Sequence, residues 1–220
     1  MKRIRKSFAA SMCLLAAFML WTAAICLVDV RAIGPQGSSV GFAGINGFVH
    51  TLTGVHFSLY TITDWLGLVP IFVCMGFGIL GLVQWIKRKS IRKVDYDILV
   101  LGGFYIVTVA AYLFFESVVI NYRPVLINGF LEASYPSSTT MLVMCVMPTA
   151  VMQLSSRIKN KVLRKLITAA IIAFIAFMVI GRLLSGVHWF TDIVGGALLS
   201  AGLVMMYRAV IGLEVRSIPK

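Results

Sequence analysis

Long apolar runs alternate with short polar segments along the chain, and six of the runs are long enough to predict membrane-spanning helices. A hydrocarbon layer about 30 Å thick is crossed by roughly 20 apolar residues in helical conformation. Backbone groups inside that layer must be hydrogen-bonded within the segment, so each run is expected to be helical. The six predicted spans are Phe8–Val28, Asp64–Ile86, Ile98–Ile120, Thr139–Leu154, Leu166–Leu184 and Phe190–Ile211.

The composition supports the same class, an all-α polytopic membrane protein. Of the 220 residues 60% are hydrophobic and 13% are charged, and the mean hydropathy is +0.94. A soluble domain is closer to half apolar and a quarter charged. The spans divide the chain into residues 1–63, with the first helix and an outer interfacial loop, a membrane core at 64–211 and a cytoplasmic tail at 212–220. One alternative is that the basic N-terminus and first apolar run form a cleaved signal peptide.

Basic residues gather in four clusters, which all fall on one side of a six-span topology. The clusters are Lys2–Lys6, Lys87–Lys93, Arg157–Lys165 and the C-terminal segment from Arg208 onwards. Loops rich in Lys and Arg stay in the cytoplasm, so both termini are expected inside the cell. The net charge of +12 is therefore a membrane-surface feature, and nucleic-acid binding is not indicated.

The cysteines and histidines show no metal-binding pattern. His50 and His56 have no neighbouring cluster of Cys, His or Asp in the sequence, as a zinc site would require. Four cysteines lie scattered through the apolar runs without a CxxC pair: Cys13, Cys26, Cys74 and Cys145. This scatter is typical of small apolar side chains in helices. The sequence therefore predicts neither a metal nor a cofactor, and it gives no oligomeric state.

Charged and polar residues meet at the outer ends of the predicted spans. Arg123 follows the third span, Arg182 ends the fifth, and His188 and Asp192 lie where the sixth begins. The run Pro136–Thr140, with the sequence PSSTT, opens the fourth span. Ionisable groups at membrane depth are costly, which makes them candidates for function. Three separate segments are thus expected to converge on one surface.

The spacing of these groups favours phosphate chemistry. His188 and Asp192 are four residues apart, which places them on one helix face. The carboxylate can then accept the imidazole Nδ1–H and leave Nε2 as a nucleophile or base. Two arginines can bind a phosphate bidentately, and a helix start rich in hydroxyls favours an anion. Each feature alone has an ordinary alternative, namely a structural His–Asp pair, interfacial anchoring arginines or a helix N-cap.

Taken together, the motifs resemble those of the type-2 phosphatidic acid phosphatases, whose relatives include bacterial undecaprenyl-pyrophosphate and lipid phosphatases. The family pattern has three parts: Lys, six residues, Arg-Pro; then Pro-Ser-Gly-His; then Ser-Arg, five residues, His, three residues, Asp. The third part reads GRLLSGVHWFTD in this chain. The resemblance covers roughly residues 64–210. The matching positions are Arg123, Pro124, Pro136, Ser137, Arg182, His188 and Asp192.

The resemblance implies a six-helix membrane phosphatase that acts on a lipid phosphate or diphosphate. Its site is expected on the outer side of a bacterial-type plasma membrane. The residue matching His188 attacks phosphorus to form a phosphohistidine, and the residue matching Asp192 orients it. The phosphate-binding positions are Arg123, Arg182, Ser137 and Ser138.

Three departures from the family pattern leave the activity open. Glu116 stands where the family has Lys, which reverses a charge beside the phosphate and makes Glu116 a modifier of the pocket. Thr139 occupies the catalytic position of the His that protonates the leaving oxygen, and losing a general acid typically costs about 10²–10⁴-fold in rate. Gly181 replaces a Ser. Two alternatives therefore remain, a lipid phosphotransferase and a non-catalytic relative that binds or transports a lipid head group.

Overall fold

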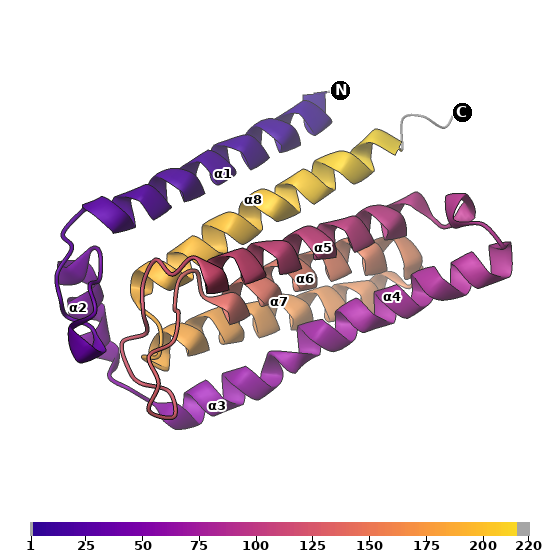
Figure 1. Cartoon of the computed structure of the whole chain (residues 1–220). Coiled ribbons are helices and arrows are strands. Elements are labelled where there is room, and N and C mark those ends of the chain that lie inside the picture. The colour runs from indigo at the N-terminus through magenta and orange to yellow at the C-terminus, as the bar shows by residue number, and fades with distance from the viewer. Residues whose placement is uncertain (1, 215–220) are drawn as a thin grey trace.

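The computed structural model describes residues 2–214 as a bundle of helices (Figure 1). Outside isolated bridges, the described residues form no β-structure, which confirms the all-α prediction. Most of the predicted tail at 212–220 lies outside the described part. The elements are α1 (Lys2–Leu27), η1 (Pro35–Gly37), α2 (Ala43–Thr53), α3 (Phe57–Leu66), α4 (Leu68–Arg88), η2 (Ile91–Lys93), α5 (Tyr96–Ser117), α6 (Ser138–Arg157), α7 (Lys161–Leu184) and α8 (Phe190–Glu214).

Within residues 2–214, six helical stretches are long and apolar enough to cross a membrane, which confirms the predicted number. The chain is therefore a multi-pass membrane protein. The second span begins at Phe57 and not at Asp64, because α3 continues into α4 through Gly67 in helical conformation. The predicted boundary at residue 63 thus falls inside a helix. At about 1.5 Å per residue, these 32 residues are longer than a layer about 30 Å thick requires.

The first helix packs against the last along most of its length (Figure 1). The Ser11 hydroxyl donates a hydrogen bond to the backbone oxygen of Gly202 at 2.8 Å. Leu15 fills the space above Gly202, where a Cβ would come within 2.8 Å of its side chain. Phe18 on the same helix belongs to the buried apolar core of the bundle. The helix of residues 1–63 is thus packed with the membrane core.

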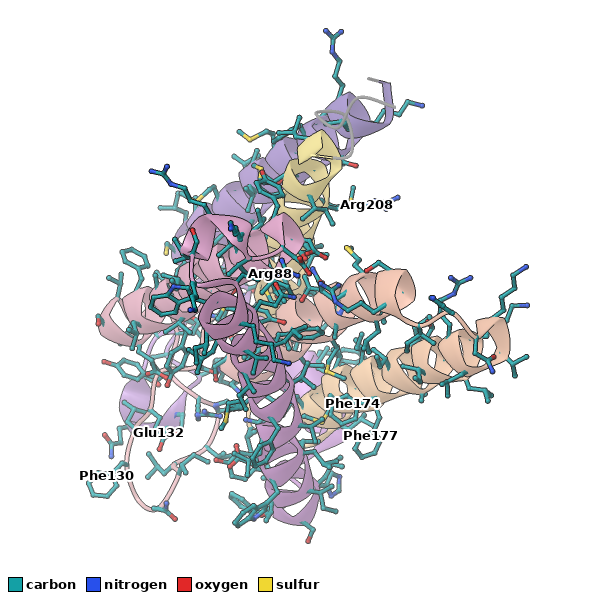
Figure 2. All side chains as sticks on the ribbon, turned by 90° about the vertical axis from the view of Figure 1, so that its right-hand side faces the viewer. Arg88, Phe130, Glu132, Phe174, Phe177 and Arg208 are labelled. Atoms are coloured by element: carbon teal, nitrogen blue, oxygen red, sulfur yellow. The ribbon has the colours of Figure 1, made fainter. Side chains whose placement is uncertain are left out.

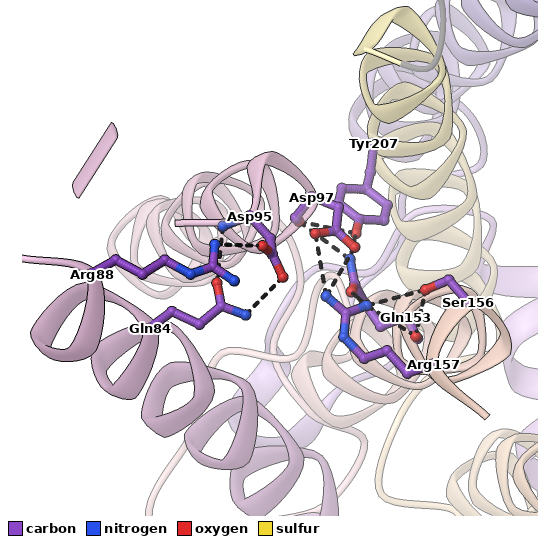
Figure 3. Close-up of polar contacts among 8 residues, drawn as sticks. All are labelled: Gln84, Arg88, Asp95, Asp97, Gln153, Ser156, Arg157 and Tyr207. Atoms are coloured by element: carbon purple, nitrogen blue, oxygen red, sulfur yellow. Dashed lines mark hydrogen bonds and ion pairs between the residues drawn. The ribbon is translucent and has the colours of Figure 1, made fainter. Parts of the chain in front are cut away.

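A polar cluster ties α5, α6 and α8 together near the end of the bundle that carries the termini (Figure 3). Gln153 is 1% exposed, and its amide donates to the Tyr207 hydroxyl at 2.5 Å and to the backbone oxygen of Asp97 at 3.2 Å. Arg157 forms an ion pair with the Asp97 carboxylate at 3.0 Å. Polar groups buried within a bundle must be paired, and this cluster supplies the partners across three helices.

A second polar contact lies at the surface beside this cluster (Figure 3). Arg88 at the end of α4 pairs with Asp95, just before α5, at 2.7 Å. The hydrogen bond from Arg88 lowers the pKa of the Asp95 carboxyl below its ordinary value. Both side chains are about two-fifths exposed, so the pair contributes little to stability.

The opposite end of the bundle is covered by α2, α3 and the loop of residues 118–137 (Figure 1). This end is called the site end below. The loop folds back on itself through hydrogen bonds between the backbones of Ile127 and Phe130. Phe130 lies at its tip and is 73% exposed, in the part of the loop labelled in Figure 2. On the flank of the bundle, Phe177 of α7 is also exposed while Phe174 packs on a buried cluster (Figure 2), as expected for a helix facing lipid on one side.

Replacing Gln153 by Ala should lower the free energy of unfolding by about 1–3 kcal/mol, because the Tyr207 hydroxyl and the backbone oxygen of Asp97 lose a buried donor. Thermal unfolding in detergent measures the loss. The control Arg88→Ala breaks the exposed pair with Asp95 and should cost no more than about 1 kcal/mol. Equal losses in the two variants would contradict a stabilising role for the buried cluster.

Candidate active site

His188 lies in the short turn between α7 and α8, and only 3% of its surface is exposed. Gly186 gives the turn its shape, with a φ of +68° that glycine adopts without strain. The chain between α2 and α3 packs directly on this turn, so that a Cβ on Gly186 would lie 1.9 Å from the Gly54 oxygen. The backbone N–H of His56 donates to the oxygen of Ser185 at 2.9 Å. The α2–α3 junction therefore fixes the turn that carries His188.

A serine connects the imidazole of His188 to the carboxylate of Asp192. The direct hydrogen bond that their spacing predicts is not formed, because His188 Nδ1 and Asp192 Oδ2 are 3.8 Å apart. Ser134 Oγ lies 3.0 Å from Nδ1 and donates to Asp192 Oδ2 at 2.5 Å. Since the serine proton goes to the carboxylate, its oxygen accepts the Nδ1–H. Ser134 lies in the irregular α5–α6 loop, where hydrophobic periodicity gives no signal for its role.

The Asp192 carboxylate is fully buried and is bound by groups from two segments, the α5–α6 loop and the α7–α8 turn. Besides Ser134, the backbone N–H of Trp189 donates to Oδ2 at 2.9 Å and the Asn121 amide donates to Oδ1 at 3.3 Å. Asp192 also lies in the first turn of α8, where the helix dipole favours a negative charge. A buried charge is tolerated only when it is hydrogen-bonded in this way.

The other ring nitrogen of His188 faces Arg123. The guanidinium Nη1 lies 3.1 Å from Nε2, and because Nδ1 carries the proton, Nε2 accepts from the arginine. Burial lowers the pKa of His188 well below its ordinary 6.5, and the positive charges of Arg123 and Arg182 lower it further. The imidazole is therefore neutral at pH 7, with its lone pair on Nε2, which is the form a nucleophile requires.

Arg123 is paired with an acidic residue of its own loop, Glu132. The two side chains form an ion pair at 3.1 Å, and the backbone N–H of Arg123 donates to the Glu132 oxygen at 3.0 Å. The Arg123 side chain is 9% exposed, whereas that of Glu132, labelled in Figure 2, is 42% exposed. The sequence carries no signal for this role of Glu132, because the fold of the loop brings it to Arg123.

Arg182, in the last turn of α7, contacts α3. Its guanidinium lies 3.6 Å from Asp64 Oδ1, 3.4 Å from the Thr63 hydroxyl and 4.9 Å from the centre of the Tyr60 ring. Its Nε is buried without a hydrogen-bond partner. Gly181 permits this approach, because a Cβ there would lie 2.8 Å from the Thr63 methyl carbon. The exchange of the family Ser for Gly thus lets α3 pack closely on α7.

The start of α6 contributes to two neighbouring cavities. Ser137 is the N-cap of α6, and its hydroxyl is fully buried without a hydrogen-bond partner. Ser138 lines a small cavity of ≈ 10 Å³ that His188 also borders. Thr139 lines a different cavity of ≈ 580 Å³, together with Asp64. Of the sequence-predicted catalytic residues, His188 and Asp192 lie together, whereas Thr139 does not reach the His188 cavity.

Glu116, in the last turn of α5, lines the His188 cavity. Among residues 2–214, no ion pair involves its carboxylate. The larger cavity beside Thr139 shares three lining residues with the His188 cavity, Tyr112, Ser138 and Met141. The two cavities are therefore adjacent. In the described part of the chain, no three His, Cys, Asp or Glu side chains are arranged to hold a metal ion.

Gly186→Ala should destabilise the site end far more than Gly129→Ala. Both glycines have a positive φ, which costs other residues about 1–2 kcal/mol. Only at Gly186 would the new Cβ also collide with the Gly54 oxygen, since nothing lies within 4 Å at Gly129. Thermal unfolding should show a clearly larger loss for Gly186→Ala, and similar losses would mean that the α2–α3 junction does not hold the His188 turn.

Comparison with known proteins places this geometry in a family. The model of the PAP2 superfamily matches residues 99–214. No curated protein matches the chain at a significant level. A crystal structure described as the first transmembrane PAP2 type phosphatidylglycerolphosphate phosphatase from Bacillus subtilis aligns with a TM-score of 0.64 and 17% identity, over 95% of this chain and 98% of that chain. At this identity the similarity concerns the fold. With more than half of its length matched by the family model, the chain belongs to the PAP2 superfamily.

Proposed function

We propose that the protein is an integral-membrane phosphatase that hydrolyses a lipid phosphate or diphosphate through a phosphohistidine on His188. The observation that carries this proposal is the state of the buried imidazole. Its Nδ1 is bound by the Ser134–Asp192 pair, and its Nε2 faces Arg123 at 3.1 Å. A neutral imidazole in a fixed tautomer beside a guanidinium suits attack on a phosphate that the guanidinium holds.

When the phosphate of the substrate binds, Arg123 exchanges its hydrogen bond to His188 for one to a phosphate oxygen. In the free protein Arg123 donates to Nε2, which occupies the lone pair needed for attack. A phosphate oxygen is the stronger acceptor for a guanidinium, so a bound phosphate draws the Arg123 N–H away and frees Nε2. The unpartnered groups Arg182 Nε and Ser137 Oγ are further donors for the phosphoryl oxygens.

The attack forms a bond from Nε2 to phosphorus and breaks the bond from phosphorus to the leaving oxygen. The imidazole ring becomes positively charged as its lone pair is shared, and the Ser134–Asp192 pair stabilises that charge through Nδ1–H. Arg123 and Arg182 stabilise the charge that spreads over the phosphoryl oxygens. Water then cleaves the phosphorus–nitrogen bond and releases phosphate.

A lipid substrate is supported by the cavity of ≈ 580 Å³ next to the site. Leu68, Ile71, Val109 and Leu142 line it with apolar side chains, and Ser138 lies on its border with the His188 cavity. An acyl or prenyl chain fits such a lining, with the phosphate directed toward His188. We place the site end on the outer face of a bacterial-type plasma membrane, because the Lys and Arg clusters lie at the opposite ends of the spans.

His188→Ala should abolish phosphate release from a lipid phosphate or diphosphate, with a loss of at least about 10³-fold. Purified protein in detergent, assayed for inorganic phosphate, measures this. His56→Ala is a matched control, since its side chain is exposed and bonds only the nearby Thr53 oxygen. Release that survives in His188→Ala would exclude the phosphohistidine. Transfer to an added acceptor lipid without net release would indicate a phosphotransferase, and binding with neither would indicate a non-catalytic relative.

In the pH profile of kcat/KM, the midpoint of the acid limb should lie below pH 6.5. Burial first, then the charges of Arg123 and Arg182, lower the pKa of His188, so the neutral nucleophile persists below the ordinary value and is lost as the pH falls through the lowered pKa. A phosphate monoester titrates near pH ~6 itself, so the profile is measured with two lipid phosphates of different acidity. The limb that belongs to His188 has the same midpoint with both substrates. A substrate-independent midpoint at or above pH 6.5 would contradict the lowered pKa of His188.

A further inference from the structure

The proposed reaction needs a group that gives a proton to the leaving oxygen, and the His188 cavity offers few candidates. Thr139 lies in the neighbouring cavity. Besides His188, the titratable residues that line the His188 cavity are Tyr112, Glu116 and Tyr135. Burial raises the pKa of Tyr135, and its hydroxyl is bonded to Thr22 at 2.7 Å. Glu116 is the only carboxyl group in this lining.

Glu116 is also placed where protons can be exchanged with water. It borders a second, open pocket at the surface, which Glu132 and Tyr122 line as well. Tyr112 and Ala133 belong to both linings, so the two pockets adjoin at Glu116. A side chain at this junction borders the His188 cavity on one side and the open surface pocket on the other.

The charge of Glu116 argues against a role in holding the phosphate. An ionised carboxylate beside a phosphate repels it, so Glu116 cannot take over the phosphate-holding role of the family lysine. A lysine ammonium donates hydrogen bonds to a phosphate and holds it by charge, whereas a carboxyl group can also give its proton to the leaving oxygen. The two departures from the family pattern are then connected: Thr139 in α6 lacks the acid of the family His, and Glu116 in α5 supplies a carboxyl group in its place.

We propose that Glu116 is the general acid and base of this site, an assignment that rests on the proposed phosphatase function. In the first step Nε2 of His188 attacks phosphorus, the bond to the leaving oxygen breaks, and the Glu116 carboxyl group gives that oxygen its proton. The products are phosphohistidine, the free lipid alcohol and a Glu116 carboxylate. In the second step the carboxylate takes a proton from water, the water oxygen attacks phosphorus, and the electron pair of the phosphorus–nitrogen bond returns to Nε2.

Glu116→Gln tests the proposal, because it keeps the shape of the side chain and removes its proton. With a lipid alkyl phosphate, the single-turnover rate of phosphohistidine formation should fall by about 10²–10⁴-fold. With an aryl phosphate, whose leaving group needs no proton, it should fall by less than about tenfold. The second step still lacks its base, so the variant should release one aryl alcohol per protein and retain the phosphate on His188.

Two further results separate this role from others. Glu116→Lys restores the family cation, and the proposal expects it to be as slow as Glu116→Gln on the alkyl phosphate. A faster Glu116→Lys would show that residue 116 acts only through charge on phosphate binding. A Glu116→Gln variant with wild-type phosphohistidine formation and turnover, alongside an inactive His188→Ala, would overturn the proposal and leave the phosphatase function standing. A wild-type protein that releases no phosphate would overturn both.

Discussion

The buried carboxylate of Asp192 is the group around which the site end is organised. An ionised group without solvent contact is stable only when protein donors replace water, and here the donors come from Ser134, Asn121 and the backbone of Trp189. The backbone oxygen of Asp192 accepts a hydrogen bond from the N–H of Ser137 at the start of α6. A single acidic residue thus joins the long α5–α6 loop, the α7–α8 turn and two helix starts. Removal of its side chain would break the hydrogen bonds that join Ser134 and Asn121 to the α7–α8 turn.

Charge balance explains why the arginines of the site are not simply exposed. Two guanidinium groups lie near a neutral imidazole in a largely buried region, and each has an acidic partner at its outer side, Glu132 for Arg123 and Asp64 for Arg182. Both partners are more exposed than the arginines that they face. A phosphate that enters therefore competes with carboxylates that water can solvate, so exchange costs less than it would from a buried ion pair.

Hydropathy predicted much of this arrangement, because a membrane imposes length and polarity on each span. The six helices, and the convergence of Arg123, Arg182 and His188 on one end, follow from span order alone. The side-chain partners did not follow. Ser134 lies in a loop without periodicity, and most of the α3 helix that contacts Arg182 falls in the segment that hydropathy predicts as an outer loop. Thr139 shows the same limit. Successive side chains on a helix are about 100° apart, so that Ser138 lines the His188 cavity whereas the side chain of Thr139 lines only the larger neighbouring cavity.

Gly181 has a consequence for how such chains diverge. The space above it is taken by the methyl group of Thr63, a residue far away in the sequence. A relative with a serine at the position of Gly181 has no room for that methyl group unless its α3 lies farther from α7. We therefore expect the residue types at these two positions to vary together, and such covariation would mark the members of the superfamily in which α3 packs on the arginine that matches Arg182.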